Sequence, residues 1–197
     1  MKQIVLFSTI TEKNKDILLK LIFPEWISNK VCAYMPSNGA NCSQTYINEW
    51  ENYAEVFGAE YNYIDNSQEN SLEIIKKLTN SNILVISGGN TFELLNNLRK
   101  SGLGDVIKRM LNKDIILIAG FSAGGLVLTP TIEVCNLPNF DQNLIGLTNL
   151  KGLELVPFEI FPHYKEALHK ESLYKYRTTS KNEVKEITDD DYLVVDL

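Results

Sequence analysis

Two short segments of the chain are apolar at every position, and they limit the folds that this sequence can adopt. Residues 83–86 and 115–118 are made of isoleucine, leucine and valine alone. A continuous apolar run of this length is typical of a central strand in a parallel sheet, because such a strand is covered on both faces. The sequence therefore predicts a parallel sheet with helices packed against both of its faces.

Similar runs recur along the chain, and amphipathic segments separate them. We predict strands at residues 4–8, 31–35, 61–64, 83–87 and 115–119. We predict helices at residues 16–23, 43–57, 71–78 and 91–98. Strands that alternate with helices of this length form right-handed βαβ units. The expected fold is α/β, with three layers, a doubly wound and mostly parallel sheet, and a single domain over residues 1–197.

The pattern weakens in the last third of the chain. We predict a loop-rich stretch, an apolar run and a polar helix at residues 130–153, 155–161 and 165–176. Residues 184–187 and 192–195 have the composition of strands, and the acidic residues 189–191 lie between them. This arrangement predicts a hairpin with an acidic turn.

Composition excludes several functions. The chain has 19 Lys and Arg against 25 Asp and Glu, a formal net charge of −6 and a pI of about 5.0, so nucleic acid is not an expected partner. No apolar stretch could span a bilayer or act as a signal peptide, which predicts a cytoplasmic protein that does not bind membranes. The spacing of Cys32, Cys42 and Cys135 matches no metal or redox motif, so we expect reduced thiols, no metal and no cofactor.

The segment Gly120-Phe121-Ser122-Ala123-Gly124 carries the main chemical signal. It follows a predicted strand directly and precedes residues that can open a helix, which is the context of a G-x-S-x-G nucleophile elbow. The N–H of Ala123, in the first helical turn, could stabilise a developing oxyanion. The alternative is a tight turn in which Ser122 only caps the helix.

A second glycine turn, at Gly88-Gly89-Asn90, also follows a predicted strand. Its glycines allow backbone N–H groups to approach a substrate closely, so it could supply a second oxyanion donor. In a parallel sheet both turns lie at the same edge, where ligands bind. The alternatives are a helix capped by Asn90 or Thr91 and a phosphate-binding loop.

A nucleophilic serine needs a base, and the chain has two histidines. His163 ends the apolar run, where it could face the same edge of the sheet, whereas His169 lies inside a charged helix. His163 is therefore the candidate base, and no role is predicted for His169. The alternative for His163 is a cap of the helix that follows.

These residues resemble peptidase family S51, which includes aspartyl dipeptidases. The resemblance covers most of the chain and rests on three segments in the order of the family, residues 88–92, 120–124 and 161–164. It implies a flavodoxin-like or class I glutamine amidotransferase-like fold. It also implies roles for residues of the two turns and the histidine: nucleophile Ser122, general base His163, oxyanion donors Gly89 and Ala123, and substrate contacts Gly88 and Asn90.

The acid of a Ser-His-acid triad is implied only by this resemblance. Asp189 is the best positional match, and Asp190 or Asp191 could substitute for it. Such an acid accepts the Nδ1–H of the histidine and holds the reactive tautomer. A second position that the family uses falls near residues 136–137, which carry no carboxylate; Glu133 and Asp141 are the nearest acids.

The expected activity is hydrolysis of small peptides, including dipeptides, by a serine peptidase that is a monomer or a homodimer. Preference for aspartate is not carried over from the family, because Arg177 is the only arginine between His163 and the acidic residues. Arg177 and Lys165 could bind a carboxylate, but solvated charges are the simpler interpretation. The alternative functions are an esterase or amidase and an inactive binding module.

Overall fold

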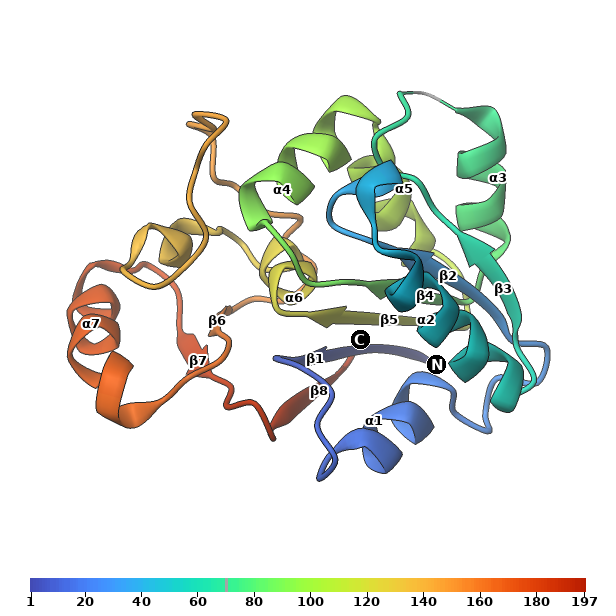
Figure 1. The fold of residues 1–197 in the computed structure, drawn as a ribbon, viewed down its shortest axis with the longest axis horizontal. Helices are drawn as coiled ribbons and strands as arrows, with labels where there is room; N and C mark the ends of the chain where they lie inside the picture. The colour runs from blue at the N-terminus through green and yellow to red at the C-terminus, as the bar shows by residue number, and fades with distance from the viewer. Residues whose placement is uncertain (70) are drawn as a thin grey trace.

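The computed structural model describes residues 1–69 and 71–197. Over these residues the main sheet has six strands in the order β3-β2-β4-β5-β1-β8 (Figure 1). The strands are β1 (Lys2–Phe7), β2 (Val31–Met35), β3 (Glu60–Tyr63), β4 (Ile83–Ile86), β5 (Ile116–Phe121) and β8 (Tyr192–Asp196). Neighbouring strands are parallel except β8, which runs antiparallel to β1. The expected mostly parallel sheet is confirmed.

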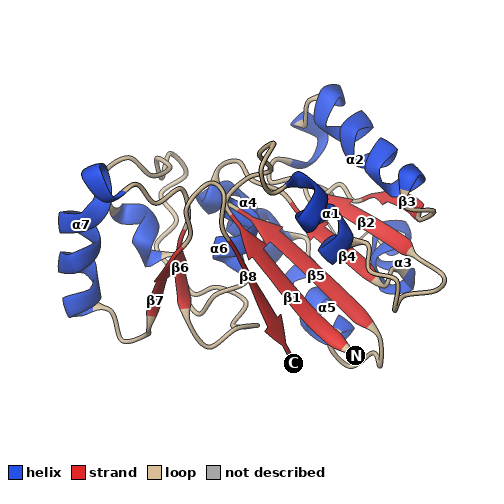
Figure 2. Ribbon diagram, turned by 90° about the horizontal axis from the view of Figure 1, so that it is seen from below, coloured by secondary structure: helices blue, strands red, loops and turns tan. Residues whose placement is uncertain are grey.

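Helices cover both faces of the sheet (Figures 1 and 2). The helices around the main sheet are α1 (Lys15–Ile22), α2 (Gln44–Val56), α3 (Leu72–Asn80), α4 (Thr91–Lys100), α5 (Leu103–Met110) and α6 (Ala123–Val127). Buried residues of α1 and α2 form one core with the sheet, and those of α3 to α6 form a second core on the opposite face. The three-layer α/β fold is therefore confirmed.

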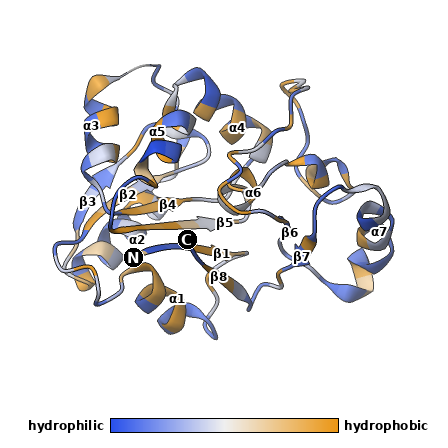
Figure 3. Ribbon diagram, turned by 180° about the vertical axis from the view of Figure 1, so that it is seen from behind, coloured by the Kyte–Doolittle hydropathy of each residue, from blue (hydrophilic) through white to orange (hydrophobic). Residues whose placement is uncertain are grey.

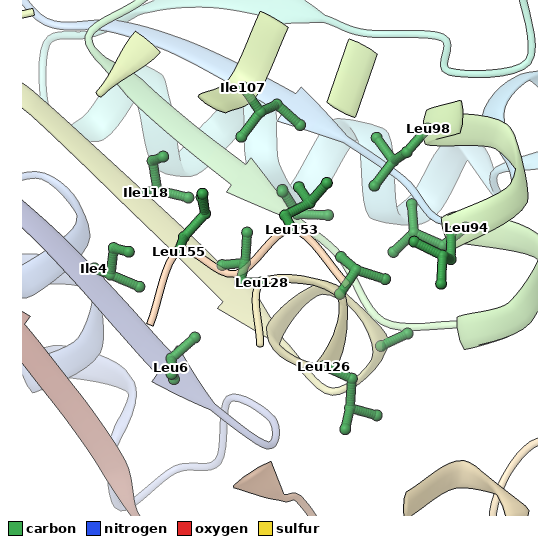
Figure 4. Close-up of a cluster of buried hydrophobic side chains, with 14 of the residues drawn as sticks. Ile4, Leu6, Leu94, Leu98, Ile107, Ile118, Leu126, Leu128, Leu153 and Leu155 are labelled. Atoms are coloured by element: carbon green, nitrogen blue, oxygen red, sulfur yellow. The ribbon is translucent and has the colours of Figure 1, made fainter. Parts of the chain in front are cut away.

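Alternate residues of each central strand belong to different cores. Ile4 and Leu6 of β1 contribute to the core under α3 to α6, whereas Val5 and Phe7 contribute to the core under α1 and α2. Figure 4 shows Ile4, Leu6 and Ile118 of the sheet facing Leu94, Leu98 and Ile107 of the helices. Orange, hydrophobic segments run along the sheet in Figure 3, while the helices carry both colours. Burial on both faces explains the continuous apolar runs in the sequence.

Helix α5 was not predicted. It starts directly after α4, from which Ser101 and Gly102 separate it, and Gly102 has a left-handed φ of 72° that turns the chain. Glycine at positions 102 and 104 lowers helix propensity, so the sequence pattern favours a loop. Burial of Val106, Ile107 and Met110 against the sheet overrides this preference.

The predicted hairpin at the acidic residues is wrong. Strand β7 (Val184–Glu186) pairs in parallel with β6 (Glu159–Phe161), and β8 pairs with β1. The two strands therefore belong to different sheets, and residues 187–191 cross between them. Figure 2 shows β6 and β7 beside the main sheet, with α7 (Glu166–Thr179) beyond them. Each strand finds a partner that is distant in sequence, which local composition does not reveal.

Short irregular elements connect the larger ones. The loop-rich stretch contains the 3₁₀ turn η2 (Glu133–Asn136) and one bridge between Thr131 and Lys151, and a second 3₁₀ turn, η1 (Gly39–Asn41), follows β2. Across residues 1–69 and 71–197, no helix is both long and apolar enough to span a membrane.

Candidate active site

Ser122 lies at the sharp turn between β5 and α6. Its backbone has a φ of 51° and a ψ of −117°, a conformation that costs energy for any residue with a Cβ, and its N–H donates to the carbonyl of Phe7 at 3.0 Å. The chain packs tightly around the turn. A Cβ on Gly124 would lie 2.0 Å from the carbonyl oxygen of Ile86, and one on Gly120 would lie 2.6 Å from that of Gly124. The glycines on either side of Ser122 are therefore required by close backbone packing.

His163 follows β6 and faces Ser122. Its Nε2 is 3.0 Å from the Ser122 Oγ, which is hydrogen-bond distance. Its backbone has a φ of 55°, and its N–H donates to the Oγ of Ser8 at 2.9 Å. The Ser8 hydroxyl donates in turn to the carbonyl of Ile187 at 3.0 Å. A buried serine at the end of β1 therefore connects the histidine to the segment that carries the acidic residues.

Asp189 contacts the other ring nitrogen of His163. Its Oδ1 is 2.6 Å from Nδ1, and its backbone carbonyl accepts a hydrogen bond from the Asn14 side chain at 3.1 Å. The side chains of His163 and Asp189 are 45% and 36% exposed, so solvent reaches both groups. Ser122, His163 and Asp189 thus lie in one hydrogen-bonded line.

The two neighbouring acids have other partners. Asp190 pairs with Lys13 at 2.6 Å and accepts from the Thr11 hydroxyl at 2.9 Å. These contacts lower the pKa of Asp190 below its usual value, the hydrogen bond from Lys13 having the largest effect. Asp191 accepts from the Thr188 hydroxyl at 2.5 Å. The geometry therefore favours Asp189 over both alternatives.

The Gly88-Gly89-Asn90 turn lies beside Ser122 at the carboxyl end of β4. Gly89 has a φ of 135°, and a Cβ there would lie 1.8 Å from the Ser37 Oγ. The Asn90 side chain caps α4, because its Oδ1 accepts from the N–H groups of Phe92 and Glu93 at 3.0 and 3.1 Å. This capping is the structural alternative considered above, so a substrate contact of Asn90 remains a prediction.

Ala123 is buried in the first turn of α6. The first N–H groups of a helix have no acceptor within the helix, so they are available to an anion. Gly89 and Ala123 come from turns at the same edge of the sheet, as expected. Their role as oxyanion donors remains a prediction.

An open cleft of about 470 Å³ lies next to Ser122 and His163. Its other described walls are formed by residues at the ends of β1, β2, β4 and β5, by the loop that enters α2 and by the first turn of α2: Ser8, Thr9, Tyr34, Pro36, Ser37, Asn38, Asn41, Cys42, Ser43, Tyr46, Ser87, Gly88, Gly89 and Phe121. Sequence reasoning found Gly88 and Gly89 but not the wall formed by the loop after β2. Ser8 and Ser37 closely follow parallel strands. Because ligands bind at the carboxyl ends of such strands, this placement could have marked both serines as cleft residues.

The remaining candidate charges lie away from the cleft lining. His169 accepts the N–H of Lys165 on its Nδ1 at 3.0 Å at the start of α7. Arg177 pairs with Glu186 at 2.5 Å. Asp141 accepts from the N–H and the hydroxyl of Thr91 at 2.8 and 2.6 Å. These contacts give His169, Arg177 and Asp141 structural roles.

Glu133 is exposed in η2 and is not among the residues that line the cleft. Within residues 1–69 and 71–197, no three His, Cys, Asp or Glu side chains are grouped so that they could hold a metal ion.

Comparison with known sequences identifies the family. The sequence profile of peptidase family S51 matches residues 5–196. The chain belongs to peptidase family S51. It is 29% identical over 173 residues to "Uncharacterized peptidase Lmo0363" of Listeria monocytogenes, covering 86% of this chain and 83% of the relative. It is 37% identical over 144 residues to "Peptidase E" of Nostoc, covering 72% of this chain and 55% of that protein.

Solved structures support the same assignment. A crystal structure of a protein provisionally assigned as a peptidase E from Listeria monocytogenes superposes with a TM-score of 0.75 at 25% identity, covering 100% of this chain and 99% of the other. A peptidase from an acI-B1 Actinobacterium shares the fold with a TM-score of 0.72 at 16% identity, covering 99% and 83% of the two chains. This S51 protein is therefore a peptidase, a class of hydrolase.

Proposed function

We propose that this S51 peptidase hydrolyses small peptides through an acyl-enzyme, with Ser122 as nucleophile, His163 as general base and Asp189 as the acid. The observation that carries the proposal is the pair of short contacts on the two nitrogens of His163, 3.0 Å to the Ser122 Oγ and 2.6 Å to the Asp189 Oδ1. A nucleophile, a base and an orienting carboxylate within hydrogen-bond reach form the constellation that acyl transfer needs.

The proposed reaction starts with the tautomer of His163. The carboxylate of Asp189 accepts the Nδ1–H, so the Nε2 lone pair faces Ser122. As the serine oxygen attacks the peptide carbonyl, Nε2 takes its proton, and the N–H groups of Gly89 and Ala123 stabilise the oxyanion. The imidazolium then gives this proton to the leaving amine, and water hydrolyses the acyl-enzyme with the same base.

The dimensions of the cleft support small substrates. Its volume of about 470 Å³ lies within the range of roughly 300–1,000 Å³ that is usual for small-ligand sites.

In this proposal Gly88 and Asn90 border the substrate and residues 1–197 act as one domain. Cys32, Cys42 and Cys135 are free thiols, which supports a reducing compartment such as the cytoplasm, and we expect a monomer or a homodimer.

Labelling with a fluorophosphonate probe tests the nucleophile and its base. We expect the parent to be labelled, and both Ser122→Ala and His163→Ala to lose labelling and dipeptide hydrolysis by at least about 1,000-fold. Asp189→Asn retains the shape of the side chain but supports the wrong tautomer, so we expect a large loss there as well.

Two matched variants control for nonspecific effects. Ser172 and His169 lie on α7 and are not part of the cleft lining. Ser172→Ala and His169→Ala should therefore retain labelling. A folded parent that neither reacts with the probe nor hydrolyses any dipeptide would contradict the proposed function.

A further inference from the structure

The cleft beside Ser122 is lined by uncharged side chains. Among its described lining residues there is no Asp, Glu, Lys or Arg, and His163 is already engaged with Ser122 and Asp189. The other lining side chains are hydroxyls, amides, one thiol, one proline and aromatic rings. A charged group that entered this cleft would find no opposite charge on its walls.

Phe121 forms an aromatic floor of the cleft and belongs to a stack of rings that continues into the core. Phe121, the residue before Ser122, stacks on Phe7 and Trp50 with ring centroids 5.2 and 5.9 Å apart. Tyr34 also stacks on Trp50, at 5.5 Å, and is only 1% exposed. The packed rings hold Phe121 in place, and its exposed part offers apolar surface to a substrate.

Two titratable groups of the cleft wall, the Cys42 thiol and the Tyr34 hydroxyl, favour their neutral forms. Burial raises the pKa of the Cys42 thiol, although a hydrogen bond with Tyr34 opposes this shift. Burial also raises the pKa of the Tyr34 hydroxyl. Both groups are therefore protonated at neutral pH, and the polar rim beside them consists of Asn38, Asn41 and Ser43.

The nearest charges either have partners or have the wrong sign for an acidic substrate. Lys165 is not among the cleft-lining residues; its side chain is 61% exposed, and its Nζ lies 3.9 Å from Asp189. A smaller hollow that shares Thr9, Tyr46 and Phe121 with the cleft contains Glu12, Lys15 and Glu49. In that hollow Lys15 lies over the Tyr53 ring, 5.3 Å from its centroid, and Glu49 accepts from the Tyr53 hydroxyl at 2.5 Å. The hollow carries two carboxylates and one ammonium, so its net charge is negative and it repels a substrate carboxylate.

We propose that this cleft is a subsite for an uncharged side chain, an amide or an aromatic ring, on the acyl side of the scissile bond. The inference rests on the proposed function, in which the Ser122 Oγ accepts the acyl group. Burying a carboxylate without a partner is unfavourable, whereas an amide can bond to the rim and an aromatic ring can pack on the floor. The walls therefore select against acidic substrates.

Four dipeptides with the same second residue test this subsite: Asn-Leu, Asp-Leu, Phe-Leu and Lys-Leu. Asn-Leu and Asp-Leu are nearly isosteric and differ in charge, so we expect kcat/KM for Asn-Leu to exceed that for Asp-Leu by at least about 10-fold. Equal values, or a preference for Asp-Leu, overturn the inference. A kcat/KM for Lys-Leu above those of Asn-Leu and Phe-Leu overturns it too, because the substrate would then face Glu12 and Glu49.

A pair of arginine variants locates the effect. Asn41 is an exposed cleft residue, whereas Gln44 is an exposed residue of α2 outside the cleft lining. Asn41→Arg supplies the missing cation, so we expect the ratio of Asn-Leu to Asp-Leu hydrolysis to fall at least fivefold, an estimate of about 1 kcal/mol. Gln44→Arg adds the same charge elsewhere and should leave the ratio unchanged. Equal effects of the two variants overturn the assignment to this cleft.

Labelling of Ser122 separates the two levels of failure. A parent that reacts with the fluorophosphonate probe at Ser122 but prefers Asp-Leu overturns the uncharged subsite and leaves the proposed function intact. A folded parent that is unlabelled and cleaves none of the four dipeptides overturns both.

Discussion

The hydroxyl of Ser8 joins two segments of the candidate site through hydrogen bonds. The residue is 1% exposed, accepts from the N–H of His163 and donates to the carbonyl of Ile187. His163 has a positive φ of 55°, so its backbone needs contacts that hold it in place. Ser8 supplies one such contact and anchors the chain two residues before Asp189.

The variant Ser8→Ala tests this positioning. The loss leaves the partly buried N–H of His163 without its acceptor, so we expect stability to fall by about 1–3 kcal/mol. Displacement of the imidazole should lower kcat about 10-fold or more with a smaller change in KM. Steady-state kinetics and urea unfolding measure the two effects.

Ser81→Ala is the matched control for Ser8. Ser81 is also buried and also donates to a backbone carbonyl, that of Lys77, but it lies at the other end of the sheet, just before β4. It should lose stability and retain kcat. An unchanged kcat in Ser8→Ala would show that Ser8 is purely structural.

The sequence singled out candidate site residues where the signal was local. Ser122 and His163 were found from the elbow and from the end of an apolar run, and both positions depend on nearby residues alone. Asp189 was one of three adjacent acids, and its choice needed the tertiary crossing that brings residues 187–191 back to the main sheet. Ser8 was missed because its role depends on contacts more than 150 positions away.

At the level of elements, the sequence predicted what local patterns encode. The strands of the parallel sheet were found, since burial on both faces leaves a continuous apolar signature. Helix α5 was missed because two glycines mask a segment that packing makes helical. The predicted pairing of β7 with β8 was wrong because strand pairing is set by the whole fold. An acidic triplet between two strands is compatible with a crossing between sheets as well as with a turn.

The elbow offers a test at this scale. A methyl group on Gly124 would meet the carbonyl of Ile86 in the central strand β4 at 2.0 Å, where backbone on both sides prevents relaxation. We expect Gly124→Ala to lower the free energy of unfolding by about 3 kcal/mol or more and to abolish probe labelling.

Gly58→Ala is the control for Gly124→Ala. Gly58 has a φ of +66°, and a Cβ there meets nothing within 4 Å. The cost should therefore be only the strain of the left-handed backbone, about 1–2 kcal/mol. Equal losses in the two variants, measured by urea unfolding, would contradict close backbone packing as the constraint at position 124.

Across the whole molecule, the candidate site joins two sheets. Ser122 comes from the main sheet, whereas His163 follows β6 of the small sheet, and Asp189 lies where the chain crosses between them. The small sheet and α7 are held together by Glu159, a 1% exposed carboxylate that accepts from the side chains of Tyr176, Ser180 and Asn182. The site can form only when both sheets are intact.

In the variant Glu159→Ala, the small sheet should unfold at a lower urea concentration than the main sheet. Three partly buried donors lose their acceptor, so we expect a local loss of about 3 kcal/mol. Trp26 and Trp50 both pack in the core under α1 and α2, so their fluorescence reports on the main sheet. Activity should therefore disappear at a lower urea concentration than the tryptophan signal.

Glu159→Gln retains an acceptor oxygen and serves as the control. Its two transitions should lie closer together than those of Glu159→Ala. Coincident transitions in Glu159→Ala would instead show that both sheets unfold as one cooperative unit.

The backbone of Ser122 has a consequence for the evolution of the chain. A serine at a φ of 51° and a ψ of −117° carries a strain of about 1–3 kcal/mol, whereas glycine adopts this conformation freely. Selection for stability alone would therefore replace this serine with glycine. The side chain at position 122 therefore costs stability, and a lineage released from the need for its hydroxyl would become more stable as it lost that group.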